Sequence, residues 1–329
     1  MLTGVLVLSI AIIIDRYFGE VSRFHPLVGF GNLANQIESR FNKKMLCGRS
    51  RVQTLKRLYG FFAWNIVVLP LPVSYYLAST SLPSEAISNW LFILLDIIVV
   101  YFAIGLNSLK QHALNIAEPL ANKNITAARQ AVSLIVSRET QSMDDKAIAR
   151  ATVESVLENG HDAVLASLFW YAVGGAPLVI LHRLANTLDA MWGYKSERFI
   201  HFGWFAAKAD DWLGWPSAKI TGAFYLLAKP RRLINITRII RRSLMQSRRY
   251  KSLNGGWVMA MGANVLKIKL GGVAVYHGQS TESVVLGQAE PAATTDINRS
   301  LSLVERASIL FVYVLMLISV SIWFIFPGF

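Results

Sequence analysis

The sequence has few charged residues and almost no cysteine. Only 16% of its 329 residues are charged and 53% are hydrophobic, whereas an average soluble domain is about 25% charged. The single cysteine, Cys47, excludes an internal disulfide framework and a cysteine-rich metal site. With a positive mean hydropathy of +0.41, this composition favours an integral membrane protein.

Several common motifs are also missing. Neither G-x-x-x-x-G-K-[ST] nor G-x-G-x-x-G occurs, so the sequence does not predict a P-loop or dinucleotide-binding site. The apolar N-terminus has no basic segment before it and no A-x-A-like cleavage site after it. We therefore expect an uncleaved membrane helix there and not a signal peptide. No internal repeat is evident, which argues against a transporter built from inverted repeats.

Long apolar stretches are what the chain does have. A bilayer span needs about 20 mostly apolar residues, and the stretches that approach this are 1–14, 60–80, 89–106 and 307–327. Stretch 163–181 is apolar but contains two glycines and a proline, so it could span, re-enter or lie buried in protein. Stretch 199–228 is aromatic-rich and contains two aspartates, which is typical of an interfacial or broken segment. Asp96 within a span is functional, lies at a helix end or is paired inside the bundle.

The net charge of +13 comes largely from two basic clusters, within 43–57 and 229–251. The positive-inside rule places both in the cytoplasm and leaves 107–162 there as well. A polyanionic ligand is the functional alternative for this charge. We predict an all-α integral membrane protein, a polytopic helical bundle forming one domain over 1–329. Large cytoplasmic helical connections at 107–162 and 229–306, together with 184–220, would carry the polar chemistry, and a small β-like segment is expected near 264–276.

The connection 107–162 ends in a helix rich in carboxylates. Ser142 and Asp145 fit a capping box, and the helix is expected to end near Asn159. Arg150, Glu154 and Glu158 then share one face at i, i+4 and i+8. This face is either a solvated row of i,i+4 pairs or part of a site. Glu158-x-x-His161 matches half of a di-iron motif, but the chain contains no second copy.

A second polar group lies in 184–220. The adjacent pair Asp210-Asp211 could hold Mg²⁺ beside basic residues, or it could cap a helix that begins at Trp212. Further along, the segment "VLKIKL" predicts a strand, and Gly271-Gly272 predicts a tight turn or a close approach of backbone to ligand.

These pieces together resemble a known family. The ordered matches are "DRYFGE…HPLVGFGNL" at 15–33, "VSRET" at 136–140, "IARATVESVLENGHDAVLASLF" at 148–169, "NTLDAMWGY" at 186–194, "FGWFAAKADDWLGWPSAKIT" at 202–221 and "NGGWVMAMGANVLKIKLGG" at 254–272. The chain resembles adenosylcobinamide-phosphate synthase, the CbiB/CobD family of cobalamin biosynthesis. His161 falls at a position that the family motif leaves free.

The resemblance implies a membrane-bound, ATP-dependent amide ligase. Its reaction would join adenosylcobyric acid to aminopropanol phosphate, or to the ethanolamine analogue, with ATP and Mg²⁺. It implies a multi-pass protein of the cell inner membrane with the site facing the cytoplasm, no nucleic-acid partner, and a homo-oligomer as an open option. A non-enzymatic or regulatory relative is the alternative.

The clustering of polar residues within the matched motifs gives a set of candidate roles. As catalytic groups we expect Glu154, Asp162 and Asp189, and as metal ligands Asp210 and Asp211. The expected substrate-binding residues are Arg138, Arg150, Asn159, Asn186, Tyr194, Lys208, Lys219, Asn254 and His25, the last of which could equally be structural.

Overall fold

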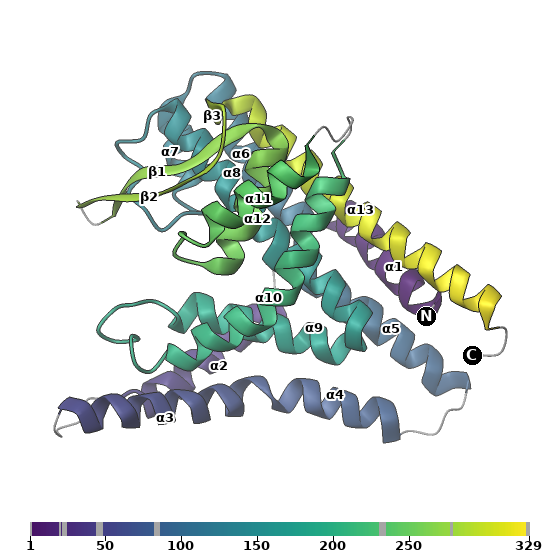
Figure 1. Cartoon of the computed structure of the whole chain (residues 1–329). Coiled ribbons are helices and arrows are strands. Elements are labelled where there is room, and N and C mark those ends of the chain that lie inside the picture. Colours follow the sequence, from purple (N-terminus) through teal and green to yellow (C-terminus); the bar gives the residue numbers. More distant parts are fainter. Residues whose placement is uncertain are drawn as a thin grey trace. The chain divides into compact units, whose positions relative to one another are not determined.

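The computed structural model describes residues 2–19, 21, 25–43, 49–81, 86–229, 235–276 and 279–326. Cys47 lies outside them. The chain divides into two compact units, unit 1 (Met1–Ile104 and Ser167–Gly214) and unit 2 (Gly105–Ala166 and Trp215–Phe329). The expected fold class is confirmed, since helices dominate both units and the β-structure of the described residues is one three-stranded sheet (Figure 1).

Unit 1 is entirely helical in its described part. Its helices are α1 (Leu2–Phe18), α2 (Pro26–Phe41), α3 (Arg49–Val68), α4 (Pro70–Ser81), α5 (Ala86–Ala103), α9 (Ala166–Trp192) and the first half of α10 (Trp204–Leu227). Proline begins α2 and α4, where its missing N–H costs no helical hydrogen bond. Gly174 and Gly175 have non-helical backbone angles, so α9 is kinked in its middle.

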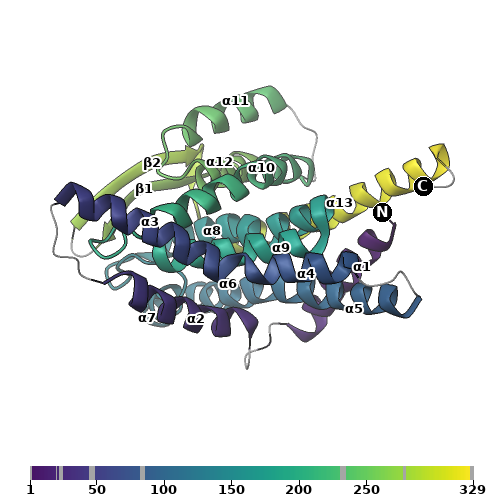
Figure 2. The same ribbon diagram turned by 90° about the horizontal axis from the view of Figure 1, so that it is seen from below.

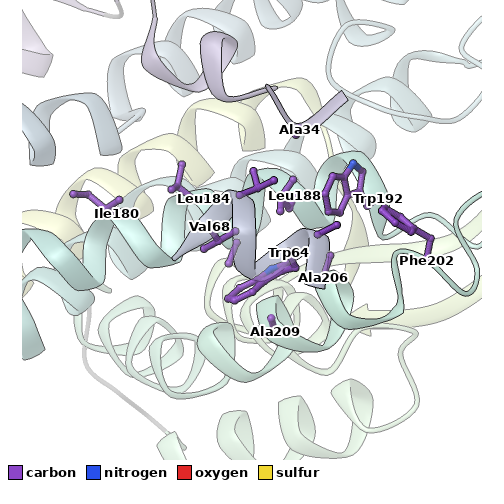
Figure 3. Close-up of a cluster of buried hydrophobic side chains, with 13 residues drawn as sticks. Ala34, Trp64, Val68, Ile180, Leu184, Leu188, Trp192, Phe202, Ala206 and Ala209 are labelled. Carbon is purple, nitrogen blue, oxygen red and sulfur yellow. The ribbon is translucent and has the colours of Figure 1, made fainter. Parts of the chain in front are cut away.

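The core of unit 1 lies between α3, α9 and α10. Figure 3 shows Trp64 and Val68 of α3 next to the row from Ile180 to Trp192 along α9, with alanines of α10 on the other side. The alanines let the helices approach closely, and the aromatic rings fill the remaining volume. Gly60 of α3 makes a close approach to the backbone, because a Cβ there would lie 1.9 Å from the Phe202 carbonyl oxygen.

Asp96 on α5 has two partners inside unit 1. The hydroxyls of Tyr75 on α4 and Tyr171 on α9 each donate to its carboxylate at 2.6 Å. A carboxylate within an apolar span needs such donors, because water is absent there. The structure therefore supports the paired interpretation of Asp96, in which it links three helices.

Unit 2 packs helices around α8 and beside a small sheet. Its elements are α6 (Leu106–Ala121), α7 (Ile125–Val132), α8 (Asp145–Asn159), the π-helix η1 (Gly160–Leu165), the second half of α10, α11 (Ile236–Ser247), α12 (Leu253–Leu266), β1 (Ile268–Tyr276), β2 (Gln279–Gly287), β3 (Glu290–Pro291) and α13 (Thr294–Ile325). The strand order is β2-β1-β3, with β1 antiparallel to β2 and parallel to β3. Figures 1 and 2 both show β1 and β2 beside α12.

Helix α8 is central to unit 2, and its N-terminus differs from the prediction. Every residue from Ala151 to Leu157 is buried, including Glu154, because α8 packs against α6, α12, α13 and β1. The N-cap is Asp144, whose carboxylate accepts the Ala147 N–H at 2.7 Å. The predicted capping box of Ser142 and Asp145 was therefore wrong, although the predicted end at Asn159 is confirmed.

Within the described residues, helices of suitable length and composition to cross a membrane cover Arg51–Ser81, Asn89–Ala121, Asp145–Trp192 and Thr294–Ile325. They contain or overlap the predicted stretches 60–80, 89–106, 163–181 and 307–327. Helix α1, from the first predicted stretch, has 17 residues and is not among them. The segment expected to be interfacial or broken instead forms α10, which continues through Pro216.

Candidate functional site

The polar face of α8 is tied to the sheet of unit 2 through Glu154. Its carboxylate pairs with Arg138 and accepts the Gly271 N–H of β1 at 2.7 Å. The Glu154 residue is only 6% exposed. The solvated-face interpretation is therefore wrong here, and the i,i+4 partner Arg150 instead donates to the Val273 carbonyl oxygen at 2.7 Å.

The glycine pair in β1 makes this contact possible. Gly271 and Gly272 have φ of 75° and 87°, a region that favours glycine. The β1–β2 register shifts between Leu270 and Gly272, so the pair forms a β-bulge that turns the Gly271 N–H toward α8. The expected turn at Gly271-Gly272 was wrong, because both residues lie inside the strand.

A cleft opens beside this contact, with a cavity volume of about 480 Å³. Four cationic and two acidic side chains line it, and the lining residues are Arg138, Glu139, Ser142, Met143, Asp144, Lys146, Ala147, Arg150, Lys269, Gly271, Val273 and Pro291. Such a concentration of cations suits a phosphate-bearing ligand, and the two carboxylates are ligand types that Mg²⁺ accepts alongside phosphate oxygens. The donor set therefore fits a nucleotide with its metal.

Sequence reasoning identified two of these cations, Arg138 and Arg150, but missed Lys146 and Lys269. Lys146 lies in the first turn of α8 and Lys269 is an exposed residue of β1. Only the second half of the predicted strand "VLKIKL" lies in β1, because Val265 and Leu266 end α12 and Lys267 is its C-cap. Only the packing of β1 against α8 showed that Lys269 lines the same cleft as Arg138.

A second polar group of unit 2 lies where α8 meets α12. The Glu158 carboxylate approaches the start of α12 so closely that a Cβ on Gly255 would lie 2.5 Å from its Oε1. The positive end of the helix dipole favours a carboxylate at this position. Four charged groups act electrostatically on this carboxylate. The acids Asp162 and Glu154 oppose its negative charge, whereas the cations Lys251 and Arg138 favour it. Asn254 begins the same turn of α12 and is 9% exposed.

Lys219 and Asn159, also predicted to bind substrate, belong to unit 2 as well. The Lys219 ammonium lies 4.3 Å from the ring centre of Trp257, a cation–π contact, and burial lowers its pKa below the usual value for lysine. Asn159 instead donates to the Ser155 carbonyl and hydroxyl oxygens of its own helix.

His161 lies in the π-helix that follows α8. Its Nε2 is 2.9 Å from the Ser217 hydroxyl and its Nδ1 is 2.6 Å from an Asp162 oxygen. His161 and Ser217 are buried, whereas the Asp162 side chain is 29% exposed. π-helical turns are frequent at functional sites. This one leaves Asp162 accessible and holds His161 inside unit 2.

The remaining candidates lie in unit 1. Asp210 accepts from the Asn186 amide at 3.2 Å, and an Asp211 oxygen lies 3.8 Å from the Lys208 ammonium. Both aspartates lie inside α10, which begins at Trp204, so the alternative that they cap a helix starting at Trp212 was wrong.

The other three unit 1 candidates have separate surroundings. Asp189 approaches Gly193 so closely that a Cβ there would lie 1.9 Å from its Oδ1. Tyr194 is 57% exposed. His25 caps α2, its Nδ1 accepting the Leu27 N–H at 3.2 Å, and this contact favours the structural interpretation of His25.

The structure thus divides the predicted site between the units. Unit 2 contains the predicted residues Arg138, Arg150, Glu154, Asn159, Asp162, Lys219 and Asn254. Unit 1 contains His25, Asn186, Asp189, Tyr194, Lys208, Asp210 and Asp211. Over the described ranges, no group of three or more His, Cys, Asp or Glu side chains gathers in a way that could hold a metal ion by itself, and metal binding at Asp210 and Asp211 stays a prediction.

Comparison with known proteins agrees with the resemblance of the motifs. The model of the CobD/Cbib protein family matches residues 8–304. A cobalamin biosynthesis protein CobD of Stutzerimonas stutzeri is 43% identical over 295 residues, covering 89% of this chain and 91% of the relative. One from Chromobacterium violaceum is 43% identical over 305 residues, covering 93% of each. One from Halalkalibacterium halodurans is 36% identical over 315 residues, covering 94% of each.

No solved structure matches the chain significantly. The family match nonetheless covers most of the sequence, including the segments that form α8, the bulged strand β1 and the cationic cleft between them. The chain therefore belongs to the CobD/Cbib family of cobalamin biosynthesis proteins.

Proposed function

We propose that this protein is a membrane-bound, ATP-dependent amide ligase that joins adenosylcobyric acid to aminopropanol phosphate, giving adenosylcobinamide phosphate. The observation that carries the proposal is the cleft beside α8, where four cations and two carboxylates surround a volume of about 480 Å³. Ligand pockets typically measure about 300–1,000 Å³. Membership of a cobalamin biosynthesis family supports the corrinoid as one substrate.

The chemistry explains why such a cleft is needed. A carboxylate is a poor electrophile, so ATP would transfer its γ-phosphoryl group to it, and ADP would leave at that step. The amine would then form the amide C–N bond as inorganic phosphate leaves. In this assignment the phosphates are neutralised by the four cations of the cleft, Arg138, Arg150, Lys146 and Lys269. Glu139 and Asp144 line the same cleft and would share the Mg²⁺ ion with the phosphates.

Glu154 and Asp162 take different roles in this proposal. Because Glu154 is buried and already accepts from Arg138 and Gly271, it orients the cleft and is not the base. Asp162 keeps 29% of its side chain exposed and is the better general base for the attacking ammonium.

The location follows from charge and hydropathy. The candidate membrane spans of the described chain and the basic clusters support a multi-pass protein of the inner membrane with the cleft beside α8 on the cytoplasmic side. There the cleft would meet soluble ATP. A homo-oligomer is compatible with this arrangement.

The test uses purified full-length protein in a neutral detergent, supplied with adenosylcobyric acid, aminopropanol phosphate, ATP and Mg²⁺. Mass spectrometry should detect adenosylcobinamide phosphate, and a parallel reaction with ethanolamine phosphate should show which amine is preferred. The double variant Lys146→Gln/Lys269→Gln should raise the KM for ATP about tenfold or more, since each lost charged contact weakens binding. Lys267→Gln is the matched control, because Lys267 is an exposed lysine just before β1 and lies outside the cleft lining.

Two results would contradict the proposal. One is a folded protein that forms no amide with either amine, which would favour a non-catalytic member of the family. The other is an unchanged KM for ATP in the double variant, which would remove the cleft from nucleotide binding.

A further inference from the structure

A second strongly basic groove lies elsewhere in unit 2, along α11. The groove is lined on the α11 side by four arginines and a methionine, namely Arg238, Arg241, Arg242, Arg249 and Met245. Strand β2 closes it with Val284 and Val285. Its cavity volume is about 540 Å³. Figure 2 shows α11 at the edge of the ribbon beside β2 and α12. None of the lining residues belongs to the cleft beside α8.

Within the described residues, the side chains of these four arginines make no hydrogen bond or ion pair with the protein. Some other arginines are paired, as Arg138 is with Glu154 and Arg299 with Asp296. No Asp or Glu lines the groove. Like charges at i, i+3 and i+4 destabilise a helix, so an external anion would relieve a real repulsion.

The sequence spacing places the four arginines on one flank of α11. Positions 238, 241, 242 and 249 fall on one flank of α11 and its C-terminal extension, at 100° per residue. The neighbouring flank is fixed to the fold, because Ile239 and Ser243 are buried and Gln246 bonds to Gly287 of β2 at 2.8 Å. The groove is therefore built on a rigid support and is not a row of mobile side chains.

The groove suits an organic phosphate, which could be free in solution or part of a lipid headgroup. An interfacial helix inserts an apolar face opposite its basic face. In α11 the side opposite the arginines carries the exposed residues Ile236, Ile240 and Leu244, so a lipid headgroup is one source of the phosphate. The groove itself adds a short apolar wall, Met245, Val284 and Val285, next to the guanidinium groups. Phosphate oxygens match arginine in charge and geometry, and the apolar wall suits the organic part of the ligand.

We infer that the α11 groove is a second binding site, which takes an organic phosphate, free or in a lipid headgroup, through Arg238, Arg241, Arg242 and Arg249. This site is separate from the proposed catalytic cleft and does not depend on the ligase assignment. It also gives part of the basic cluster 229–251 a role beyond membrane orientation.

The experiment measures equilibrium binding of radiolabelled ATP to the full-length protein in neutral detergent. The parent variant is Lys146→Gln/Lys269→Gln, in which the α8 cleft is weakened, so that the remaining binding reports the groove. Adding Arg241→Gln and Arg242→Gln should weaken this remaining binding about tenfold or more. Arg248→Gln, on the same helix end but outside the groove lining, should leave it unchanged.

The outcomes separate the two sites and the two ligand sources. Arginine-dependent ATP binding would support the site with a free phosphate as its ligand, and arginine-dependent retention on phosphatidylglycerol vesicles without ATP binding would support it with a lipid headgroup. Equal ATP binding and equal vesicle retention with and without the groove arginines would overturn the inference, whatever the cleft variants do to ligation. If the Arg241→Gln/Arg242→Gln protein unfolds at a lower temperature than its parent, the exposed pair Arg238→Gln/Arg249→Gln replaces it with the same expected loss.

Discussion

Removing the Glu154 carboxylate should loosen the link between α8 and the sheet of unit 2. Its side chain accepts from Arg138 and from the Gly271 N–H at 2.7 Å. The side chains of Glu154 and Arg138 are only 8% and 14% exposed, so water screens this pair weakly. In Glu154→Ala both contacts are lost. In Glu154→Gln the amide oxygen can still accept the Gly271 N–H, while the ion pair is gone.

The magnitude follows from burial. Breaking a buried ion pair by removing one partner costs about 3–5 kcal/mol, and a hydrogen bond to a charged group contributes about 1.5–3 kcal/mol. Since these terms overlap at one carboxylate, we expect Glu154→Ala to lower the free energy of unfolding of unit 2 by about 3–5 kcal/mol. Glu154→Gln should cost about half as much, because one of the two contacts survives.

A double-mutant cycle checks this reasoning. Glu154→Gln, Arg138→Gln and the double variant are unfolded in detergent by heat or denaturant, and the coupling energy between the two sites is taken from the four proteins. We expect a coupling of about 1–3 kcal/mol, within the range seen for residues in contact. A coupling near zero would refute the buried pair. Complete loss of ligation in Glu154→Gln at unchanged stability would instead make Glu154 the base and contradict its positioning role.

Three further predictions concern unit 1. Gly60→Ala should destabilise the protein by about 1–3 kcal/mol, because its Cβ would lie 1.9 Å from a backbone carbonyl oxygen. Gly29→Ala, with open space around its Cβ, is the control, and equal melting temperatures of the two variants would refute the close approach. Asp96→Asn should cost about 0.6–1.7 kcal/mol, as interhelical hydrogen bonds do in membranes, and unfolding in detergent identical to the wild type would contradict its linking role. Burial raises the Glu38 pKa, but hydrogen bonds from Arg198 and Asn42 outweigh this effect and hold the pKa below 4.5. The stability of the protein should therefore fall as the pH drops below 4.5, and an equally steep fall in the Glu38→Gln variant would refute this prediction.

Hydropathy alone predicted the membrane helices, because a bilayer span needs a long apolar run and little else. The strand expected near 264–276 was predictable in part, because apolar and basic residues alternate in "VLKIKL", but residues 264–266 belong to α12 and β1 begins at Ile268. The cap at Asp144 was missed, because Ser142 and Asp145 matched the capping pattern equally well in the sequence. Only backbone geometry decides which oxygen reaches the Ala147 N–H.

The candidate site depended more strongly on tertiary structure. Spacing placed Arg150, Glu154 and Glu158 on one face of α8, but it could not show that this face is covered. The bulge at Gly271 was equally hidden, since a glycine pair predicts a turn as readily as an irregular strand. The arginine flank of α11 was visible in the sequence as charge, but not as a groove closed by β2.

The sequence by itself therefore determined that this chain is a helical membrane protein of a cobalamin biosynthesis family, because apolar length and ordered motifs are local properties of the chain. The tertiary structure decided what the polar residues do. It buried Glu154 against β1, left Asp162 accessible and joined Lys146 to Lys269 across one cleft. Those outcomes depend on which elements pack together, and long-range packing between α8 and a strand more than a hundred residues away cannot be deduced from local spacing.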